Sequence, residues 1–361
     1  MKKNLVGIHC KDLQVLVLDR MAMPLIDGLE VKISQEITER YANEFTTSAG
    51  MLLDKAGLAW MRWRVDGLEA WWNFFEECID VPMGRRLANA ACDEEEWLIS
   101  SGQLDVSGFF KNRKSVTTIN SRWELFGWGQ PLISPPGVES GVLTPIVCGF
   151  LQADLERKNN CRYRMRWEQK SSEHCRLNLE NSTSPIVPAP PPPKSESYQL
   201  GLPTSLQIEN KWCLEGKRHC LLPAGLFSRL EDACAGFTAN ISEDERAAWP
   251  ERGDGFLAMA LASFRLFVAG EELFMAADAA GWKDSVSVLF GERGLGSPSK
   301  VEFVDNHGGV ELHFDWLPFL PISVGMIAAA WTRCEGRPVK VELSVNNSEI
   351  TVRLSSRYEL A

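Results

Sequence analysis

The sequence lacks an apolar run long enough to cross a membrane. Its longest uncharged stretch, residues 316–332, contains Pro318 and Pro321 and is shorter than the roughly 20 residues that a helical span needs. The first five residues also lack the apolar core of a secretion signal. We therefore expect a protein that has no membrane span and is located in the cytoplasm.

Basic residues are in deficit. The chain contains 38 Lys and Arg residues against 48 Asp and Glu residues, which gives a formal net charge of −10. Such a chain repels phosphate backbones unless its basic residues are concentrated on one face. The composition therefore predicts an acidic protein that does not bind nucleic acid.

Closely spaced cysteine or histidine pairs, which zinc sites commonly use, are absent. The ten cysteines are scattered, and His174 directly precedes Cys175. Neighbouring side chains on a strand point to opposite faces, so these two would not share one metal ion. We predict buried free thiols, no metal site and no cofactor, with a zinc site as the alternative.

The chain also contains no catalytic signature. The glycine-rich stretch 291–296 is followed by a strand-like run rather than a helix, so it fails the context of a phosphate loop. The acidic run 93–96 is expected on the solvated face of a helix. Cys148 lies in the first turn of a predicted helix, where a thiol pKa falls, but its apolar neighbours indicate burial. We predict no catalytic residues.

A proline-rich stretch is the clearest punctuation in the chain. Residues 182–205 include four consecutive prolines, at positions 190–193, which cannot enter a helix or a central strand. They favour an extended, semi-rigid spacer. We therefore predict a first domain over 1–181, a linker over 182–205 and a second domain over 206–361. The alternative is that the prolines form a docking ligand for an aromatic groove.

Hydrophobic periodicity predicts the same general plan for both domains. In the first domain, we expect strands at 4–9 and 13–18, helices at 29–64, 66–78 and 85–99, strands within 115–128, a helix at 145–158, and strands at 161–168 and 175–180. In the second, we expect strands at 206–214 and 218–222, helices at 226–235, 256–268 and 271–280, strands at 285–290, 300–304 and 310–316, a helix at 322–333, and strands at 339–345 and 350–354. The predicted fold class is α/β of the α+β type, with helices packed on mainly antiparallel sheets.

The ends of the two domains also match residue by residue. An offset of 176 aligns Pro145 with Pro321 and Gly149 with Gly325, and a slip of one residue then aligns the last strands. Both ends read as a helix followed by strand, turn and strand. We interpret the second domain as a divergent repeat of the first. The alternative is that two unrelated domains share this ending by chance.

Tryptophan is abundant, and the first domain holds most of it. The chain contains 13 tryptophans, eight of them before residue 170. The adjacent Trp71 and Trp72 diverge by about 100° on a helix, so they cannot both face one core squarely. Tryptophans fill cores, and they also line pockets and interfaces. Both interpretations remain open for Trp71, Trp72 and Trp128.

Residues 120–180 resemble the 4-vinyl reductase domain family of small ligand-binding α/β domains, which occur in sensors and tetrapyrrole-related proteins. The resemblance is carried by Phe-Gly-Trp-Gly at 126–129, Pro-Ile-Val-Cys-Gly-Phe at 145–150 and Glu-His-Cys-Arg-Leu-Asn-Leu at 173–179. A fainter similarity covers 309–355. The resemblance implies a pocket between the helices and the sheet, and often a dimer.

The chain departs from the family pattern where family members hold a metal. Those members carry a further cysteine on the strand before the last turn, where this chain has Tyr163, Met165 and Trp167. In the second domain, Ile350 or Thr351 stands at the position of Cys175. A metal site of the family's kind is therefore not expected.

These observations lead to one principal hypothesis and two alternatives. The principal hypothesis is a non-enzymatic binding or assembly module of a cytoplasmic complex or sensor pathway. It would hold a partner protein, a second copy of itself or a small apolar ligand. One alternative is an enzyme acting on a hydrophobic or tetrapyrrole-like substrate, and the other is a scaffold that uses its proline-rich segment for docking. The candidate binding residues are Trp71, Trp72, Trp128, Cys148 and His174.

Overall fold

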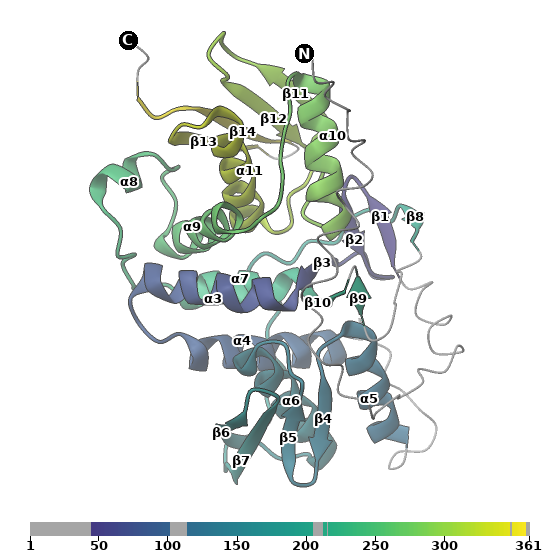
Figure 1. Ribbon diagram of the computed structural model, residues 1–361. Coiled ribbons are helices and arrows are strands. Elements are labelled where there is room, and N and C mark those ends of the chain that lie inside the picture. The colour runs from purple at the N-terminus through teal and green to yellow at the C-terminus, as the bar shows by residue number, and fades with distance from the viewer. Residues whose placement is uncertain (1–44, 102–113, 205–211, 215, 347–348, 359–361) are drawn as a thin grey trace, which may run out of the picture. The chain divides into compact units, whose positions relative to one another are not determined.

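The computed structural model describes residues 45–101, 114–204, 212–214, 216–346 and 349–358. All of them belong to one compact unit, Gln35–Ala361. The predicted fold class is confirmed, because helices pack on antiparallel sheets throughout these residues (Figure 1). We call residues 45–181 the first half and residues 212–358 the second half. Strands predicted at 4–9 and 13–18, and most of the one at 206–214, lie outside the described residues.

Each half ends in a four-stranded antiparallel sheet with a helix between its two hairpins. The two sheets have the same strand order, β4-β5-β7-β6 in the first half and β11-β12-β14-β13 in the second. The first set comprises β4 (Gln130–Ile133), β5 (Pro136–Glu139), α6 (Thr144–Asn159), β6 (Tyr163–Ser171) and β7 (His174–Asn181). The second comprises β11 (Lys300–Phe303), β12 (Val310–Phe314), α11 (Leu320–Glu335), β13 (Val339–Asn346) and β14 (Glu349–Ser356).

The helix and the strand after it keep one spacing between the halves. Helix α6 spans Thr144–Asn159 and α11 spans Leu320–Glu335, an offset of 176 at both ends. The one-residue slip that follows has a structural cause. Strand β6 pairs with β7 through an irregularity between Gln169 and Ser171, where one extra residue enters the strand. Common descent of the halves stays a prediction, although their topology is the same.

A glycine lies where the long helices cross in each half. A Cβ atom on Gly149 of α6 would overlap the carbonyl oxygen of Ala88 in α4 (Gly84–Ser100). A Cβ atom on Gly325 of α11 would overlap the carbonyl oxygen of Ala260 in α9 (Asp254–Ala269). Both helix pairs can therefore approach closely only because no side chain stands at the crossing.

A third sheet joins the two halves. Its strand order is β8-β1-β2-β3-β10-β9, and β3 of the first half pairs antiparallel with β10 of the second. The strands are β1 (Thr46–Ser48), β2 (Met51–Leu53), β3 (Ala59–Arg64), β8 (Leu202–Pro203), β9 (Cys213–Leu214) and β10 (Lys217–Pro223). The halves thus share a sheet as well as a buried apolar core, and whether they count as separate domains stays a prediction.

The helices beside this sheet exchange contacts reciprocally. Helix α3 (Val65–Ile79) of the first half packs on α9, and α7 (Ala224–Ala233) of the second half packs on α4. Helix α9 is buried on nearly all sides because it lies between α3 and α11. Two glycines show the same reciprocal contacts between the halves. Gly127 of the first half approaches the carbonyl of His219, and Gly294 of the second half approaches the carbonyl of Trp60. His219 precedes α7 by the same number of residues as Trp60 precedes α3.

Several predicted elements are wrong. The residues at 115–128 form helix α5 (Lys114–Phe126) rather than strands. The described part of the predicted helix 29–64 forms strands β1, β2 and β3. No helix covers 271–278. The strand predicted at 285–290 lies in helix α10 (Ala279–Leu289). Asp278 caps the start of this helix by accepting a hydrogen bond from the Gly281 amide. The short helix α8 (Glu243–Ala247) was not predicted.

The described part of the proline-rich stretch, which we call the proline segment (residues 182–204), makes many contacts. Arg229 of α7 donates a hydrogen bond to the Pro190 carbonyl at 2.6 Å, and the Lys194 amide donates one to Ser228 at 3.0 Å. Tyr198 packs edge-on against Trp316, and β8 pairs with β1. The segment therefore lies along the second half before it joins the shared sheet.

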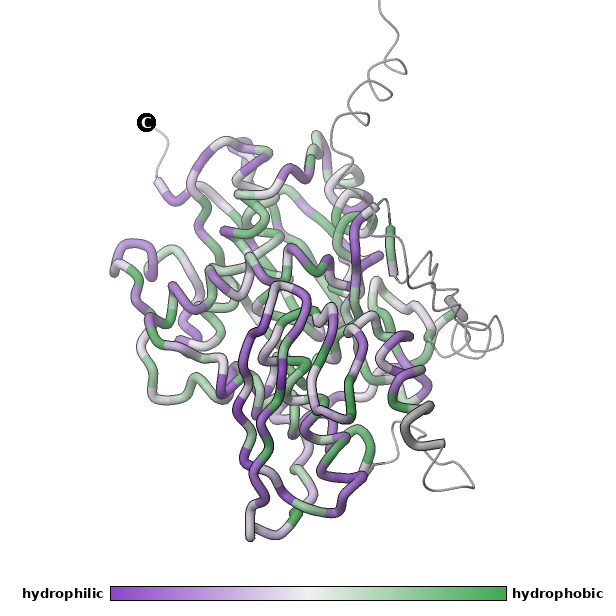
Figure 2. The backbone as a smooth tube through the Cα atoms, turned by 60° about the horizontal axis from the view of Figure 1, so that its bottom comes forward, coloured by the Kyte–Doolittle hydropathy of each residue, from purple (hydrophilic) through white to green (hydrophobic). Residues whose placement is uncertain are grey.

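The hydropathy of the backbone follows this arrangement. Figure 2 shows hydrophilic and hydrophobic residues alternating along the strands, as expected for sheets with one face against a helix and one in solvent. None of the helices within the described residues combines the length and the apolarity that crossing a bilayer requires.

Candidate functional site

The predicted binding residues do not line one shared pocket, and four of the five are buried. Trp71, Trp72, Trp128 and Cys148 are at most 6% exposed. His174 is half-buried at the start of β7, where its ring lies 3.8 Å from the Glu139 carboxylate. None of the three pockets described below is lined by any of these residues.

The tryptophans of the first half meet the second half of the same chain. The Trp71 indole donates a hydrogen bond to Ser263 of α9 at 2.9 Å, and the Trp128 indole donates one to the Leu221 carbonyl of β10 at 2.7 Å. Trp63 stacks on Phe227 of α7. Trp72 packs on Phe75 within its own helix. The surfaces that cover these rings are therefore supplied within the chain.

Cys148 lies against Cys175, which is one residue from His174. The two sulfur atoms are 3.7 Å apart, between α6 and β7, and both side chains are buried. The hydrogen bond with Cys175 and burial both raise the pKa of the Cys148 thiol. A nucleophile needs the opposite shift, so the geometry gives no support to Cys148 as a reactive group.

The prediction of a solvated acidic run at residues 93–96 is wrong for two of its members. Glu94 and Glu95 of α4 are fully buried. Glu94 binds Arg229 of α7 at 2.9 Å, and Glu95 forms an ion pair with Arg122 of α5. Because α4 lies between α6 and α7, it has little solvated face, so its carboxylates reach buried arginines instead.

Glu94 should make the stability of the protein depend on pH. Burial, only partly offset by Arg229, raises the pKa of Glu94 to about 7, whereas an unfolded chain has a glutamate pKa near 4.3. The folded state therefore binds the proton more tightly. The stabilisation from Glu94 is fully present below about pH 4 and is lost as pH rises toward 7.

The Glu94→Gln variant should lack this dependence. We expect the free energy of unfolding of the wild type, measured in urea, to fall relative to the variant between pH 4.5 and pH 7.5, by an amount on the order of 2 kcal/mol. An equal difference at both pH values would contradict the assignment. The exposed Glu180→Gln variant is the control.

The strongest candidate for a binding site is a groove between the halves, which we call the arginine groove. Its first side is formed by β3 and the start of α3, and its second by the end of α9, residues 270–272, α11 and the turn Gly291–Arg293 with Leu295. Its enclosed volume is about 60 Å³. This volume suits one small polar group rather than a whole cofactor.

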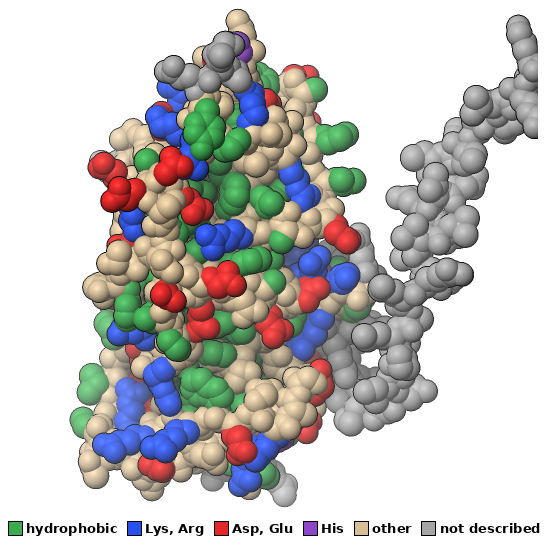
Figure 3. All heavy atoms as spheres, turned by 60° about the vertical axis from the view of Figure 1, so that its left-hand side comes forward, with side chains coloured by type: hydrophobic (Ala, Val, Ile, Leu, Met, Phe, Trp, Pro, Cys, Tyr) green, Lys and Arg blue, Asp and Glu red, His purple; other side chains and the backbone are tan. Residues whose placement is uncertain are grey.

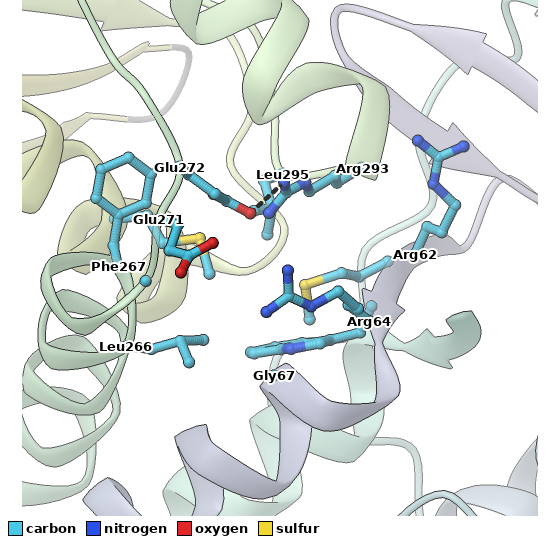
Figure 4. A pocket seen from close by; sticks show the side chains of 13 residues that line it. Arg62, Arg64, Gly67, Leu266, Phe267, Glu271, Glu272, Arg293 and Leu295 are labelled. Atoms are coloured by element: carbon cyan, nitrogen blue, oxygen red, sulfur yellow. Dashed lines mark hydrogen bonds and ion pairs between the residues drawn. The ribbon is translucent and has the colours of Figure 1, made fainter. Parts of the chain in front are cut away.

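Three arginines gather at this groove. Arg62 and Arg64 lie on the same face of β3, and Arg293 comes from the turn of the second half (Figure 4). Arg293 binds Glu272 at 2.6 Å, and Arg64 binds Asp66 at 2.5 Å. Figure 4 shows the Arg64 guanidinium pointing into the groove on the side of Glu271, while Arg62 points away from it.

Arg62 is the least compensated of the three. Its Nε atom is buried and has no hydrogen-bond partner among the described residues. Burial, followed by the like charge of Arg293, lowers the pKa of Arg62, and Glu292 opposes this. A buried guanidinium beside another guanidinium, with its Nε atom unpaired, is stabilised by an anionic group that comes within reach.

His219 of β10 adds a fourth group that responds to these charges. It lies directly opposite Arg64 in the shared sheet, so both side chains are on one face. Burial lowers the pKa of His219, and the charges of Arg62, Arg293 and Arg64 add to this effect against a hydrogen bond with the Lys217 carbonyl. Burial, together with these positive charges, therefore favours the neutral form of His219.

A second groove occupies the equivalent place on the other half. The arginine groove is lined by Arg64, which precedes α3, and by Leu266 of α9. The second groove is lined by Pro223, which precedes α7, and by Glu94 of α4. Leu266 and Glu94 stand at the same spacing after Ala260 and Ala88 at the helix crossings. The second groove is closed over by Pro192, Lys194, Ser195, Glu196 and Tyr198 of the proline segment.

A wider hollow lies elsewhere on the second half. It has a volume of about 360 Å³ and is formed by α8, α9, the end of α11 and the start of β13. Its apolar lining includes Trp249, Leu261 and Phe264, and two arginines, Arg337 and Arg357, stand at its side. This volume falls in the range of small-molecule sites.

Sequence reasoning missed the arginine groove for a traceable reason. The alternation of Met61, Arg62, Trp63 and Arg64 was the available signal, since period two indicates a strand with one polar face. The alternation was overlooked because a helix was predicted over 29–64. Arg293 is distant in sequence, and contacts of its turn with β2 and β3 bring it to the groove.

Comparisons of the chain with family models, with curated proteins and with solved structures found no match.

Proposed function

We propose that the protein is a non-enzymatic binding protein that holds an acidic segment of a partner protein in the arginine groove. The observation that carries the proposal is a groove that both halves build, with the Arg64 guanidinium pointing into it and with Arg293 and Arg62 among its lining residues. Guanidinium groups bind carboxylates through paired hydrogen bonds. A volume of about 60 Å³ suits a side-chain carboxylate of that partner.

The equivalent groove supports a segment of chain as the occupant. There, residues of the proline segment between 192 and 198, which includes a turn at 193–194, line the groove, and the Pro190 carbonyl accepts a hydrogen bond from Arg229. The arginine groove has the same position relative to its helices. An arginine in place of Pro223 and a leucine in place of Glu94 favour an occupant that supplies a carboxylate.

The charge of the rest of the surface differs from that of the arginine groove. On the face drawn in Figure 3, acidic and basic side chains are interspersed with apolar ones. The chain as a whole is acidic, with a net charge of −10. A local group of arginines on such a chain attracts an acidic segment over short range, while the overall charge discourages nonspecific binding of polyanions.

An acidic peptide tests the proposal directly. We expect a fluorescent glutamate-rich peptide to bind the full chain, and the Arg62→Ala/Arg64→Ala double variant to bind it about tenfold more weakly, which corresponds to about 1.4 kcal/mol. Fluorescence anisotropy measures both affinities. Binding should also weaken as salt is raised, because the contact is between charges.

Two controls make the result specific. The Arg164→Ala/Arg166→Ala variant removes two exposed arginines of β6 and should leave the affinity unchanged. A lysine-rich peptide of equal length should not bind the groove. Equal loss of affinity in both double variants would mean that overall charge, rather than the groove, attracts the peptide, and the proposal would fail.

The hollow beside Trp249 favours a second candidate function, the binding of a small apolar ligand. Its volume of about 360 Å³ and its aromatic lining are the specific observations. The side chains of Arg337 and Arg357 would suit a ligand with one acidic end. Quenching of tryptophan fluorescence by a medium-chain fatty acid, and loss of that quenching in Trp249→Leu, is the expected result.

A further inference from the structure

Four titratable side chains converge on one face of the sheet at the end of the second half. Glu302 of β11 lies directly opposite Glu311 of β12. His313 lies two residues beyond Glu311, so it shares the same face. Glu349, at the start of β14, reaches His313 from the other side. Three antiparallel strands therefore bring an imidazole and three carboxylates together.

The distances among three of these groups resemble those around a metal ion. The His313 Nε2 atom is 3.2 Å from Glu311 Oε1 and 3.6 Å from Glu302 Oε2. The ligand atoms of all three lie within 4.8 Å of one another. Two ligands of a tetrahedral zinc ion, each bonded at about 2.0–2.1 Å, are roughly 3.3 Å apart.

The fourth group fixes how the imidazole is oriented. The His313 Nδ1 atom is 2.7 Å from Glu349 Oε1, and a carboxylate there accepts a hydrogen bond from Nδ1–H. The lone pair of the neutral ring then lies on Nε2. Metal-binding histidines commonly have such a carboxylate partner on the nitrogen that does not bind the metal.

The Nε2 atom is buried, and none of the described residues makes a hydrogen bond of good geometry with it, although the whole side chain is 15% exposed. Instead it faces two carboxylate oxygens. A lone pair directed at two anionic groups is repulsive unless a proton on Nε2 or a metal cation stands between them.

We propose that Glu302, Glu311 and His313 form a binding site for a divalent transition-metal cation such as Zn²⁺, with Glu349 as a positioning residue. Imidazole and carboxylate are ligands that zinc accepts. Water completes the coordination on the solvent side, since Glu302 is 49% exposed. The site lies outside the arginine groove and does not depend on the function proposed for it.

Two further residues predict how a substitution changes the metal affinity and how many ions bind per chain. Lys300 binds Glu302 at 2.7 Å, so its ammonium group competes with a metal ion for that carboxylate. In the first half, Gly137 stands opposite Arg176, at the place where His313 stands opposite Thr351. The first half therefore lacks the imidazole, and we expect one ion per chain.

Cobalt(II) titration of the full chain tests the site. We expect one ion to bind per chain, with visible absorption of a nitrogen and oxygen site and without the charge-transfer absorption of thiolate ligands. His313→Ala and Glu311→Gln should each lower the affinity tenfold or more, and Glu349→Gln should lower it by about tenfold. Zinc should displace the cobalt.

The Lys300→Ala variant separates a metal site from a plain network of ion pairs. Removing the competing ammonium group should raise the cobalt affinity, whereas it would only weaken a network. His307→Ala, at an exposed histidine outside the cluster, is the matched control and should bind cobalt like the wild type. Circular dichroism confirms that each variant folds.

The proposal is overturned by any of four results. The first two are an absence of cobalt binding and binding that His313→Ala leaves unchanged. The others are thiolate charge-transfer absorption, which would assign the ion to cysteines, and a decrease in affinity in Lys300→Ala.

Discussion

Replacing Gly325 with alanine should destabilise the protein by about 3 kcal/mol, although alanine is the better helix former. An added Cβ atom would overlap the backbone carbonyl of Ala260 and approach the Ser263 side chain in α9. Backbone cannot rotate away as a flexible side chain can. Helices α9 and α11 must therefore separate, which opens their shared core.

Urea unfolding measures this loss, and another glycine provides the control. Gly84 lies at the start of α4, and a Cβ atom there would make only ordinary contacts, 3.5 Å from Pro145 and 3.9 Å from Trp167. Gly84→Ala should therefore be neutral or stabilising by up to about 1 kcal/mol. If both substitutions had the same effect, close approach at the crossing would not be the reason for the glycine.

The second large effect is expected at the buried charges of the first half. Arg122→Met should lower the free energy of unfolding by about 3–5 kcal/mol, because Glu95 would be left buried without its ion-pair partner. The loss of Arg122 should destabilise buried Asp154 less than Glu95. Asp154 keeps a hydrogen bond from Trp123 at 3.0 Å and an ion pair with Arg157.

A double-mutant cycle identifies the cause. Adding Glu95→Leu to Arg122→Met removes the uncompensated charge, so the double variant should be more stable than the single variant Arg122→Met. Urea unfolding at neutral pH measures all three variants. Additive losses in the double variant would mean that the ion pair is not what couples these two sites.

The end of each half could be predicted because its sequence pattern is local. Helix α6 has a proline in its first turn, and the hairpin after it alternates apolar and polar residues. Such signals do not depend on distant parts of the chain. The same pattern repeats at α11, which is why the predicted ranges there agree closely with the structure.

Helix α5 was mispredicted because two signals conflict there. Its first turns are rich in valine, threonine and isoleucine, which favour strands. However, Ile119, Trp123 and Phe126 are buried and recur at helical spacing. The longer-range pattern prevails because these side chains enter one core, and burial outweighs local preference.

The candidate sites could not be predicted because they depend on contacts between segments that are distant in sequence. The arginine groove needs the contact of the turn Gly291–Arg293 with β3, and the cluster at His313 needs the register of β11, β12 and β14. The abundance of tryptophan, in contrast, is visible in the sequence. The residues that cover several of these rings lie in the second half of the chain, and no local pattern indicates which residues they are.

The strand pairing between the halves has a consequence for how copies of the chain can associate. Cleavage or separate expression of the halves would leave β3 and β10 as exposed edges, which invite another strand to pair. The same edges would allow two chains to exchange halves, with β3 of one molecule on β10 of the other and all contacts retained. Dimers formed at high concentration would then be domain-swapped, and they would revert only by unfolding.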